Sequence, residues 1–202
     1  VNAMTPPSTT SDPPLSPSRT TVVILTHNYG RFLRQAIESV LAQTRAPARL
    51  IVVDDASDDD PASVVQPYLD RVEFHRVEFR REQRTRNYGL ALAKTDYVLF
   101  LDADDYMAPR MVELLEDALD RHPQAKVAYC DKVVFGDEAV MKRMDLTPSW
   151  QAGAFSVRRL QFSNFVMSTS LIRRNSIEAF DERFANLTDW DTWLGLLKDD
   201  TH

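Results

Sequence analysis

Residues 97–105 read Tyr-Val-Leu-Phe-Leu-Asp-Ala-Asp-Asp, an apolar run that ends in three carboxylates. A continuous run of this kind is typical of a strand that is buried on both faces of a parallel sheet. Residues 50–58 repeat the arrangement, because Leu-Ile-Val-Val leads there into Asp-Asp-Ala-Ser-Asp. Residues 21–25 form a third buried run, which ends in a polar turn at 26–30. These runs predict the centre of a parallel sheet.

Segments with a helical period of apolar residues separate the runs. The stripe within 32–41 is one example, and Pro61 and Pro109 stand where proline fits the first turn of a helix. Because strand, turn and helix follow one another repeatedly, the sequence predicts an α/β domain with a mainly parallel sheet flanked by helices. The other expected elements are a more polar strand at 72–77 and helices at 61–69, 85–93 and 109–119.

The pattern changes in the last third of the chain. Strands are expected at 127–135 and 166–172 and a Trp-rich helix at 187–197, whereas 139–165 has no clear period. The Pro-, Ser- and Thr-rich residues 1–19 are expected to be a disordered leader that begins with a cloning remnant. Because the chain stops soon after the last expected helix, we expect a sequence truncated at its C-terminus.

Composition limits the functional classes. The chain has 24 Lys and Arg against 30 Asp and Glu, a net charge of −6, which argues against general nucleic-acid binding. A single cysteine, Cys130, excludes an intrachain disulfide, and its apolar neighbours favour a buried structural thiol. No apolar run approaches the roughly 18 residues that a membrane-spanning helix needs. We expect a cytoplasmic protein, or one that is peripheral at the inner face of the membrane.

Carboxylates gather at one predicted edge of the sheet. Ligands of open α/β sheets bind outside the carboxyl ends of the parallel strands. Five carboxylates fall along that edge, namely Asp54, Asp55, Asp102, Asp104 and Asp105. Such crowding is unfavourable unless a cation or hydrogen-bond donors compensate the charge. If the strand continues past residue 102, Asp102 and Asp104 point to the same side and suit Mg²⁺ or Mn²⁺.

Each of these positions also has a structural alternative, because aspartate is common in turns and at helix N-caps. The run 58–60 before Pro61 is interpreted as capping, whereas three carboxylates after 97–101 exceed what one cap needs. Guanidinium groups that suit a diphosphate lie between the two acidic clusters, with a solvated face as their alternative. They belong to Arg80, Arg81, Arg84 and Arg86.

Four stretches in order resemble the motifs of one enzyme family. Residues 22–44 look like its first strand, turn and helix, and 52–58 are similar to its uridine-contacting motif. Residues 85–90 resemble its Arg-Asn-x-Gly segment, and 100–105 look like its DxD metal motif. Residues 20–198 therefore resemble the inverting glycosyltransferases of family 2, which have the Rossmann-like GT-A fold and use nucleotide-activated sugars.

The resemblance implies a donor site with a metal ion. Asp104 would ligate an Mn²⁺ or Mg²⁺ ion that bridges the diphosphate, and Asp102 would contact the ribose or a metal-bound water. By resemblance the donor is a UDP-sugar. The positions implied to bind the nucleotide-sugar are Thr26, Asn28, Asp54, Asp55, Arg81, Arg86 and Asp102.

The resemblance also implies a catalytic base. The family carries it in a Glu-Asp pair at the start of a Trp-bearing helix, where this chain reads Thr188-Asp189-Trp190. Asp189 matches the base, Asp191 is its rival, and Thr188 replaces the usual Glu. His27 likewise stands where Tyr is usual. The implied reaction inverts the anomeric centre as a sugar moves to a hydroxyl of a glycan, a lipid-linked acceptor or a small molecule, in polysaccharide or cell-envelope synthesis.

Two other classes of function stay open. One is a sugar nucleotidyltransferase, which the chain's five glycines and lack of a glycine-rich loop do not favour. The other is a non-catalytic nucleotide- or carbohydrate-binding domain, which the Thr188 departure favours. Within the glycosyltransferase interpretation, we expect a nucleotide-sugar half at 20–126 and a smaller acceptor-side half at 127–202.

Overall fold

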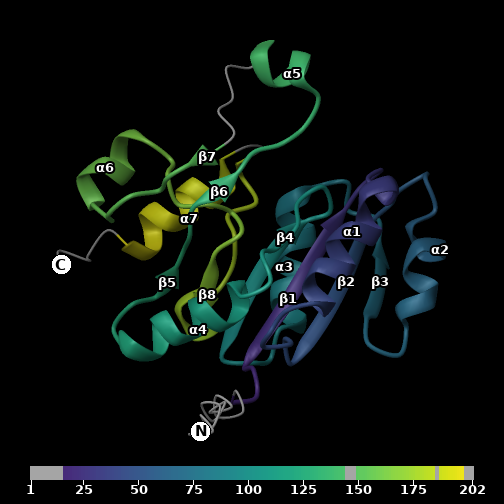
Figure 1. Cartoon of the computed structure of the whole chain (residues 1–202), viewed down its shortest axis with the longest axis horizontal. Helices are drawn as coiled ribbons and strands as arrows, with labels where there is room; N and C mark the ends of the chain where they lie inside the picture. The colour runs from purple at the N-terminus through teal and green to yellow at the C-terminus, as the bar shows by residue number, and fades with distance from the viewer. Residues whose placement is uncertain (1–15, 144–148, 185–186, 198–202) are drawn as a thin grey trace, which may run out of the picture.

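The computed structural model describes residues 16–143, 149–184 and 187–197. Its main sheet has six strands in the order β3-β2-β1-β4-β8-β5 (Figure 1). β8 (Leu171–Arg173) runs antiparallel to both β4 and β5 (Val127–Ala128). The predicted α/β class with a mainly parallel sheet is confirmed. The parallel strands are β1 (Thr20–Thr26), β2 (Arg49–Asp55), β3 (Glu73–Val77) and β4 (Tyr97–Asp102).

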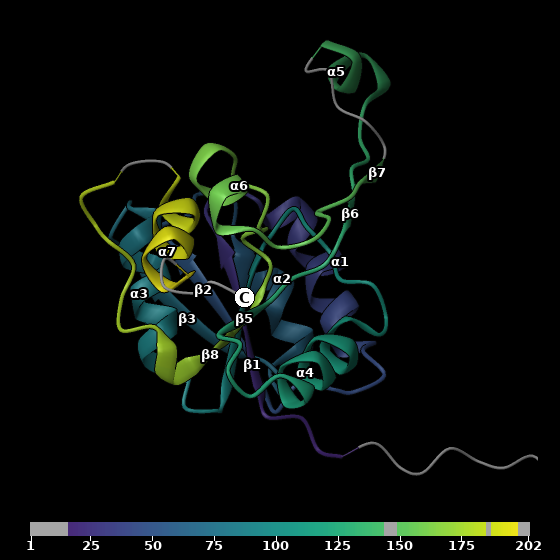
Figure 2. The ribbon, with the colours of Figure 1, turned by 90° about the vertical axis from the view of Figure 1, so that its left-hand side faces the viewer.

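Helices cover both faces of this sheet, which forms the middle of three layers (Figure 2). One face carries α1 (Gly30–Leu41), α2 (Pro61–Val65) with the 3₁₀ turn η1 (Gln66–Tyr68), and α4 (Met111–Arg121). The other face carries α3 (Glu82–Leu92), α6 (Val157–Phe162) and α7 (Thr188–Leu197). A second 3₁₀ turn, η2 (Arg174–Ser176), follows β8.

Strand β1 shows why the apolar runs lie at the centre. Val22 and Ile24 face the helices of one layer, while Val23 and Leu25 face those of the other. The first three of these side chains are fully buried. Burying one such side chain contributes roughly 1.5–3 kcal/mol relative to exposing it, so a strand without polar interruptions suits a position between two layers.

The segment expected to be one strand at 127–135 is broken. Only its ends pair, as β5 and as β6 (Lys132–Val133), which forms a separate two-stranded sheet with β7 (Ser149–Trp150). Helix α5 (Glu138–Arg143) follows β6 and has no buried residue. In both ribbon views α5 stands away from the main sheet (Figures 1 and 2).

The strand expected at 166–172 forms only at its end, as β8. Within 163–170, the Ser170 hydroxyl donates to the carbonyl of Met167 at 2.6 Å, and the Ser170 amide donates to the carbonyl of Ser168 at 3.0 Å. Such local bonds from serine compete with the bonds of a strand ladder. The prediction was wrong for most of this segment because the hydrogen bonds close locally.

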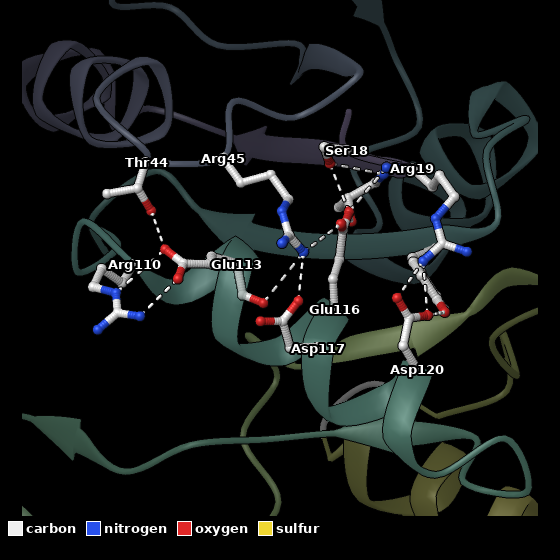
Figure 3. Close-up of polar contacts among 11 residues, drawn as sticks. Ser18, Arg19, Thr44, Arg45, Arg110, Glu113, Glu116, Asp117 and Asp120 are labelled. Carbon is white, nitrogen blue, oxygen red and sulfur yellow. Dashed lines mark hydrogen bonds and ion pairs between the residues drawn. The ribbon is translucent and has the colours of Figure 1, made fainter. Parts of the chain in front are cut away.

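A polar network fixes the start of β1 to α4, at the amino ends of the parallel strands (Figure 3). The buried Glu116 forms an ion pair with Arg45 at 3.2 Å, and Arg45 also pairs with Asp117 at 2.8 Å. Glu116 accepts further bonds from the hydroxyls of Ser18 and Thr20 at 2.6 and 2.5 Å. Because a buried charge that loses its partner is costly, this network holds the two elements in one register.

The single cysteine agrees only in part with its prediction. Cys130 is half-buried rather than buried, and this burial raises the pKa of its thiol, which disfavours the reactive thiolate. Among the residues that the structure describes, no helix is long and apolar enough to cross a membrane.

Candidate functional site

A pocket of about 390 Å³ opens at the carboxyl ends of β1, β2 and β4. This is the edge at which ligands of parallel α/β sheets bind. Asn28, Asp54, Arg86 and Asp189 were also expected at the site, but they do not line this pocket. The polar residues that line it include Thr26, Asp55, Arg80, Arg81, Asp102 and Asp104.

Asp55, at the end of β2, is saturated with hydrogen bonds. One carboxylate oxygen accepts from the backbone amides of Phe79 and Arg80, each at 2.7 Å. The other accepts from the Arg81 amide at 2.9 Å and the Thr85 hydroxyl at 2.8 Å. Asp55 thus holds the loop that enters α3, and α3 begins at Glu82 rather than at the expected Thr85. A carboxylate that is distant in sequence thus holds the residues leading into this helix. Such a contact cannot be predicted from the local sequence.

Asp54 has a different environment. Its side chain is fully buried, accepts from the Ser57 amide at 3.1 Å and forms an ion pair with Arg76. Both carboxylate oxygens therefore serve the turn that follows β2. Asp54 does not line the pocket.

The turn after β1 is fastened to the turn after β2. The His27 Nδ1–H donates to the carbonyl of Asp55 at 2.5 Å. Asn28 has a φ of +60°, a left-handed conformation that Asn tolerates better than most residues. Its side-chain oxygen accepts from the Asp58 amide at 2.7 Å, and its own amide donates to the Ser57 hydroxyl at 2.9 Å. Asn28 therefore joins two loops rather than lining the pocket.

The capping interpretation of 58–60 is confirmed for two of the three residues. Asp60 is the N-cap of α2 and accepts from the Ser63 amide at 3.4 Å. Asp59 accepts from the amide of Gly30, the first residue of α1, at 2.7 Å. These carboxylates satisfy helix N-termini and are not available to a ligand.

Thr26, the last residue of β1, carries an unsatisfied group. Its hydroxyl oxygen is buried, and no residue that the structure describes forms a hydrogen bond with it. Thr26 also lines the pocket. Leaving a buried polar group without a partner costs about 1–3 kcal/mol, so this hydroxyl is suited to a bound ligand.

The carboxylates after β4 lie in a tight turn. The strand ends at Asp102, the Ala103 amide donates to the carbonyl of Leu25, and the Asp105 amide donates back to the carbonyl of Asp102, both at 3.0 Å. Asp102 and Asp104 therefore do not alternate along a continuing strand, as the sequence suggested. Both still border the pocket, because the turn lies at its rim.

Two carboxylates of this turn, Asp102 and Asp105, have a raised pKa. Burial raises the pKa of Asp102, Arg86 opposes that shift, and nearby acidic groups reinforce it. The pKa of Asp105 rises to about 6 because of burial and the charges of Asp102 and Asp104, with Lys132 acting in the opposite direction. The turn after β4 thus carries negative charge that the protein compensates only in part.

The buried side chain of Arg86 partly compensates this negative charge. It is 4% exposed and donates to Asp102 at 3.0 Å and to Glu82 at 2.8 Å. Its guanidinium also lies over the ring of Phe100. Arg86 therefore contacts two residues that line the pocket, Asp102 and Glu82, without lining it itself. Arg81 does line the pocket, and one of its guanidinium nitrogens donates to the carbonyl of Glu182 at 2.8 Å.

The acidic turn offers an incomplete set of metal ligands. Within the described part of the chain, no group of three or more His, Cys, Asp and Glu side chains is arranged to hold a metal ion. Mg²⁺ commonly takes one or two carboxylates and completes its shell with water and substrate phosphate. Asp102 and Asp104, whose charge is compensated only in part, fit that role.

Asp189 lies at the start of α7, close to the acidic turn. Its negative charge contributes to the raised pKa of both Arg86 and Asp102. One of its oxygens accepts from the side-chain amide of Asn164 at 2.9 Å, and the other accepts from the Trp190 amide at 2.8 Å. The rival Asp191 instead contributes to the raised pKa of Arg183. The two candidates thus act on different charged groups.

Thr188 has a structural place. It is 4% exposed, and its hydroxyl accepts from the side-chain amide of Gln83 in α3 at 2.9 Å. This bond ties the start of α7 to the helix whose N-terminal loop borders the pocket. The neutral hydroxyl of Thr188 therefore pairs with the neutral amide of Gln83, and both side chains are buried.

Residues of the 85–90 stretch have roles that sequence reasoning missed. Asn87 exchanges two hydrogen bonds with the backbone of Phe180, at 2.7 and 3.0 Å, and so ties α3 to the segment that precedes α7. A Cβ on Gly89 would lie 2.6 Å from Val23, so glycine allows α3 to approach β1 closely. Both positions fall in a stretch that the resemblance had singled out. Asn164, in contrast, lay in the region without a clear period.

Comparison with known proteins identifies the family. The chain matches the family model described as glycosyl transferase family 2 over residues 21–180. It therefore belongs to glycosyltransferase family 2, as the motifs predicted.

The relatives are uncharacterised proteins of similar sequence. An uncharacterised glycosyltransferase of Haemophilus influenzae is 28% identical over 188 residues, covering 88% of this chain and 71% of the relative. A Mycobacterium tuberculosis protein is 29% identical over 185 residues, covering 86% of this chain and 51% of the relative. The chain thus spans about half the length of several curated relatives that it matches.

Solved structures show the same GT-A fold. Staphylococcus aureus TarS 1–349 in complex with UDP matches with a TM-score of 0.64 and 20% identity, over 85% of this chain and 52% of that one. The mannosyltransferase PcManGT from Pyrobaculum calidifontis, in complex with GDP-Man and Mn²⁺, matches with a TM-score of 0.64 and 16% identity. That match covers 93% of this chain and 55% of that one.

Proposed function

We propose that this chain is the donor-binding and catalytic domain of a metal-dependent inverting glycosyltransferase. It would move a sugar from a nucleoside-diphosphate sugar, by default a UDP-sugar, to an acceptor hydroxyl in glycan or polysaccharide synthesis. The observation that carries the proposal is the pocket at the strand ends of a family 2 chain. That pocket combines a hydroxyl with no partner among the described residues, two arginines and an acidic turn whose charge is compensated only in part.

The two sides of the pocket would hold the two parts of the nucleotide. Thr26 and the loop that Asp55 organises would lie against the base and ribose, since both line the pocket at the ends of β1 and β2. Arg80 and Arg81 would approach the diphosphate, because guanidinium groups match phosphate geometry. The nucleotides in the titles of TarS and PcManGT, UDP and GDP-Man, support a nucleotide-sugar donor.

Asp104 and Asp102 would hold the metal ion, Mn²⁺ or Mg²⁺. When bound, such an ion would stabilise the negative charge that develops on the departing diphosphate. Arg86 would keep the Asp102 carboxylate in place from below, because its ion pair with one oxygen, Oδ1, constrains the side chain. The Mn²⁺ in the PcManGT complex supports a divalent cation.

Asp189 would act as the general base. Its carboxylate would take the proton from the acceptor hydroxyl as the acceptor oxygen forms a bond to the anomeric carbon. The bond between that carbon and the phosphate oxygen would break, and its electron pair would leave with the nucleoside diphosphate. Attack opposite to the leaving group inverts the anomeric configuration. The proximity of Asp189 to Asp102 supports this assignment over Asp191.

Calorimetric titration tests the donor site. We expect UDP to bind in the presence of Mn²⁺ and to bind at least about tenfold more weakly in EDTA, because the acidic turn repels the diphosphate without a cation. GDP and dTDP titrated in parallel identify the preferred base. If none of the three binds in Mn²⁺, the chain is not a nucleotide-sugar transferase.

Substitution of the base tests the chemistry. Asp189→Asn should lower the release of nucleoside diphosphate from the preferred sugar nucleotide by about 100-fold or more, because the amide cannot accept the proton. The affinity for the nucleoside diphosphate should stay within about twofold, since Asp189 does not line the pocket. Asp191→Asn is the matched control on the same helix turn and should keep near-normal turnover. The reverse outcome for the two variants would assign the base to Asp191.

A further inference from the structure

The carboxylate of Asp189 has a partner from outside its own helix. Asn164 lies in the segment between α6 and β8, and its side-chain Nδ2 donates to Oδ2 of Asp189 at 2.9 Å. Because a carboxylate accepts hydrogen bonds only, the amide nitrogen of Asn164 must face Asp189. The other side-chain atom, Oδ1, therefore points elsewhere.

The segment that carries Asn164 is firmly attached to α7. The indole nitrogen of Trp190 donates to the carbonyl of Leu160 at 2.6 Å. The indole nitrogen of Trp193 donates to the carbonyl of Val166 at 3.0 Å. These two bonds flank Asn164 in sequence, and Trp193 is almost fully buried. The backbone on both sides of Asn164 is therefore hydrogen-bonded to α7, which fixes the position of the Asn164 amide relative to that helix.

Asn164 is a poor choice for stability alone. Its Oδ1 is buried and accepts no hydrogen bond from the residues that the structure describes. A buried amide oxygen without a partner is unfavourable, and an apolar residue of similar shape would avoid that cost. Within the described part of the chain, the side chain of Asn164 donates to Asp189.

We propose that Asn164 is a positioning residue, which orients the carboxylate of Asp189 toward the acceptor hydroxyl. This inference rests on the proposed function. The Asn164 N–H holds Oδ2, and the Trp190 amide holds Oδ1, so rotation of the carboxylate is restricted from both sides. When Asp189 takes the proton, the bond from Asn164 remains, because the nitrogen donates to either form of the carboxyl group.

Two variants of Asn164 test the proposal. Asn164→Leu keeps the approximate shape and removes the donor, and Asn164→Asp is nearly isosteric but places a second carboxylate beside Asp189. Each should lower kcat for release of UDP from UDP-GlcNAc or of GDP from GDP-Man, with Mn²⁺ and water as the acceptor, on the order of 10- to 100-fold. The KM for the donor and the Kd for the nucleoside diphosphate should change less than about twofold. A structural defect would instead change all of these constants.

Thr169→Val is the matched control. Thr169 lies in the same segment, and its buried hydroxyl also has no hydrogen-bond partner among the described residues. Its removal should leave kcat unchanged and should not lower the unfolding temperature. If Asn164→Leu fails to fold, Asn164→Asp still tests the contact with the smallest change of shape.

The double variant separates the possible failures. In the Asp189→Asn background, Asn164→Leu should cause no further loss of kcat, because positioning has no effect without the base. Full kcat in both Asn164 variants, while Asp189→Asn is inactive, overturns the positioning role and leaves the proposed function intact. Absence of turnover in the unaltered protein with every sugar nucleotide overturns the proposed function and this inference with it.

Discussion

The turns after β2 and β4 look alike in sequence and differ in use. Both follow a buried apolar run, and both begin with aspartate at the same edge of the sheet. After β2, Asp54 and Asp55 accept bonds from Ser57, Arg76 and the loop that enters α3. After β4, burial and neighbouring carboxylates raise the pKa of Asp102 and of Asp105, and Asp102 and Asp104 line the pocket.

The difference shows that the supply of donors, rather than the number of carboxylates, decides what an acidic turn does. The turn after β2 meets backbone amides and a hydroxyl, so its charge is compensated within the fold. The turn after β4 meets one buried cation, Arg86, for three carboxylates. The first turn is therefore a structural clamp, whereas the second keeps negative charge that the fold compensates only in part, as the proposed cation site requires.

The largest expected effect comes from breaking the clamp. Asp55→Ala leaves four donors without their acceptor, and we expect the free energy of unfolding to fall by about 3–5 kcal/mol. Urea denaturation measures the change. The exposed Asp58 in the same turn provides the control, because Asp58→Ala should change stability by less than about 0.5 kcal/mol. A loss of under about 1 kcal/mol for Asp55→Ala would contradict the clamp.

The fold at the centre of the sheet could be predicted from sequence because each parallel strand is long enough to show its pattern. β1, β2 and β4 each bury an unbroken apolar run between two helical layers. On the other side, strands were expected at 127–135 and 166–172, but their bounds could not be predicted, since β5 has only two residues and β8 three. Their pairing with β4 depends on contacts far along the chain, which local periodicity does not contain.

The sequence predicted the edge of the sheet at which the pocket lies, but it did not predict the role of each residue there. Thr26, Asp102 and Asp104 line the pocket as expected. Asp54 and Arg86 do not line it. The side chain of Asp54 is paired with Arg76, and that of Arg86 with Asp102. A sequence shows which groups carry charge, but it does not show which partners neutralise them. Asn164 illustrates the same limit, since its contact with Asp189 spans 25 positions.

The second prediction concerns the open turn. Asp104→Ala removes an exposed carboxylate, so the free energy of unfolding should change by less than about 0.5 kcal/mol in the absence of metal. Nucleotide binding in Mn²⁺ should nevertheless weaken by about 10- to 100-fold, because the cation loses a ligand. Denaturation in EDTA and calorimetry in Mn²⁺ measure the two effects. A large loss of stability with unchanged affinity would make this turn a second clamp.

The smallest expected effect is a pH-dependent gain in stability. The pKa of Asp105 is about 6 in the fold and about 3.9 in an unfolded chain, so its ionised form is disfavoured in the folded state. Its charge therefore lowers stability progressively as the pH rises from about 4 through 6, and Asp105→Asn removes that penalty. Although the surroundings of Asp105 partly desolvate its carboxylate, water still reaches the side chain and screens its charge, so the gain in free energy should stay below about 1 kcal/mol.

Thermal unfolding in EDTA measures this gain. Asp105→Asn should raise the unfolding temperature by about 1–3 °C at pH 7.5 and leave it unchanged near pH 4. Mn²⁺ should stabilise the unaltered protein at pH 7.5 for the same reason, since a cation also relieves the repulsion. The corresponding neutralisation after β2, Asp55→Asn, should lower the unfolding temperature at pH 7.5, because it exchanges an acceptor oxygen for a donor. A rise in unfolding temperature for Asp105→Asn and a fall for Asp55→Asn would show that the fold compensates the carboxylates after β2 but not fully those after β4.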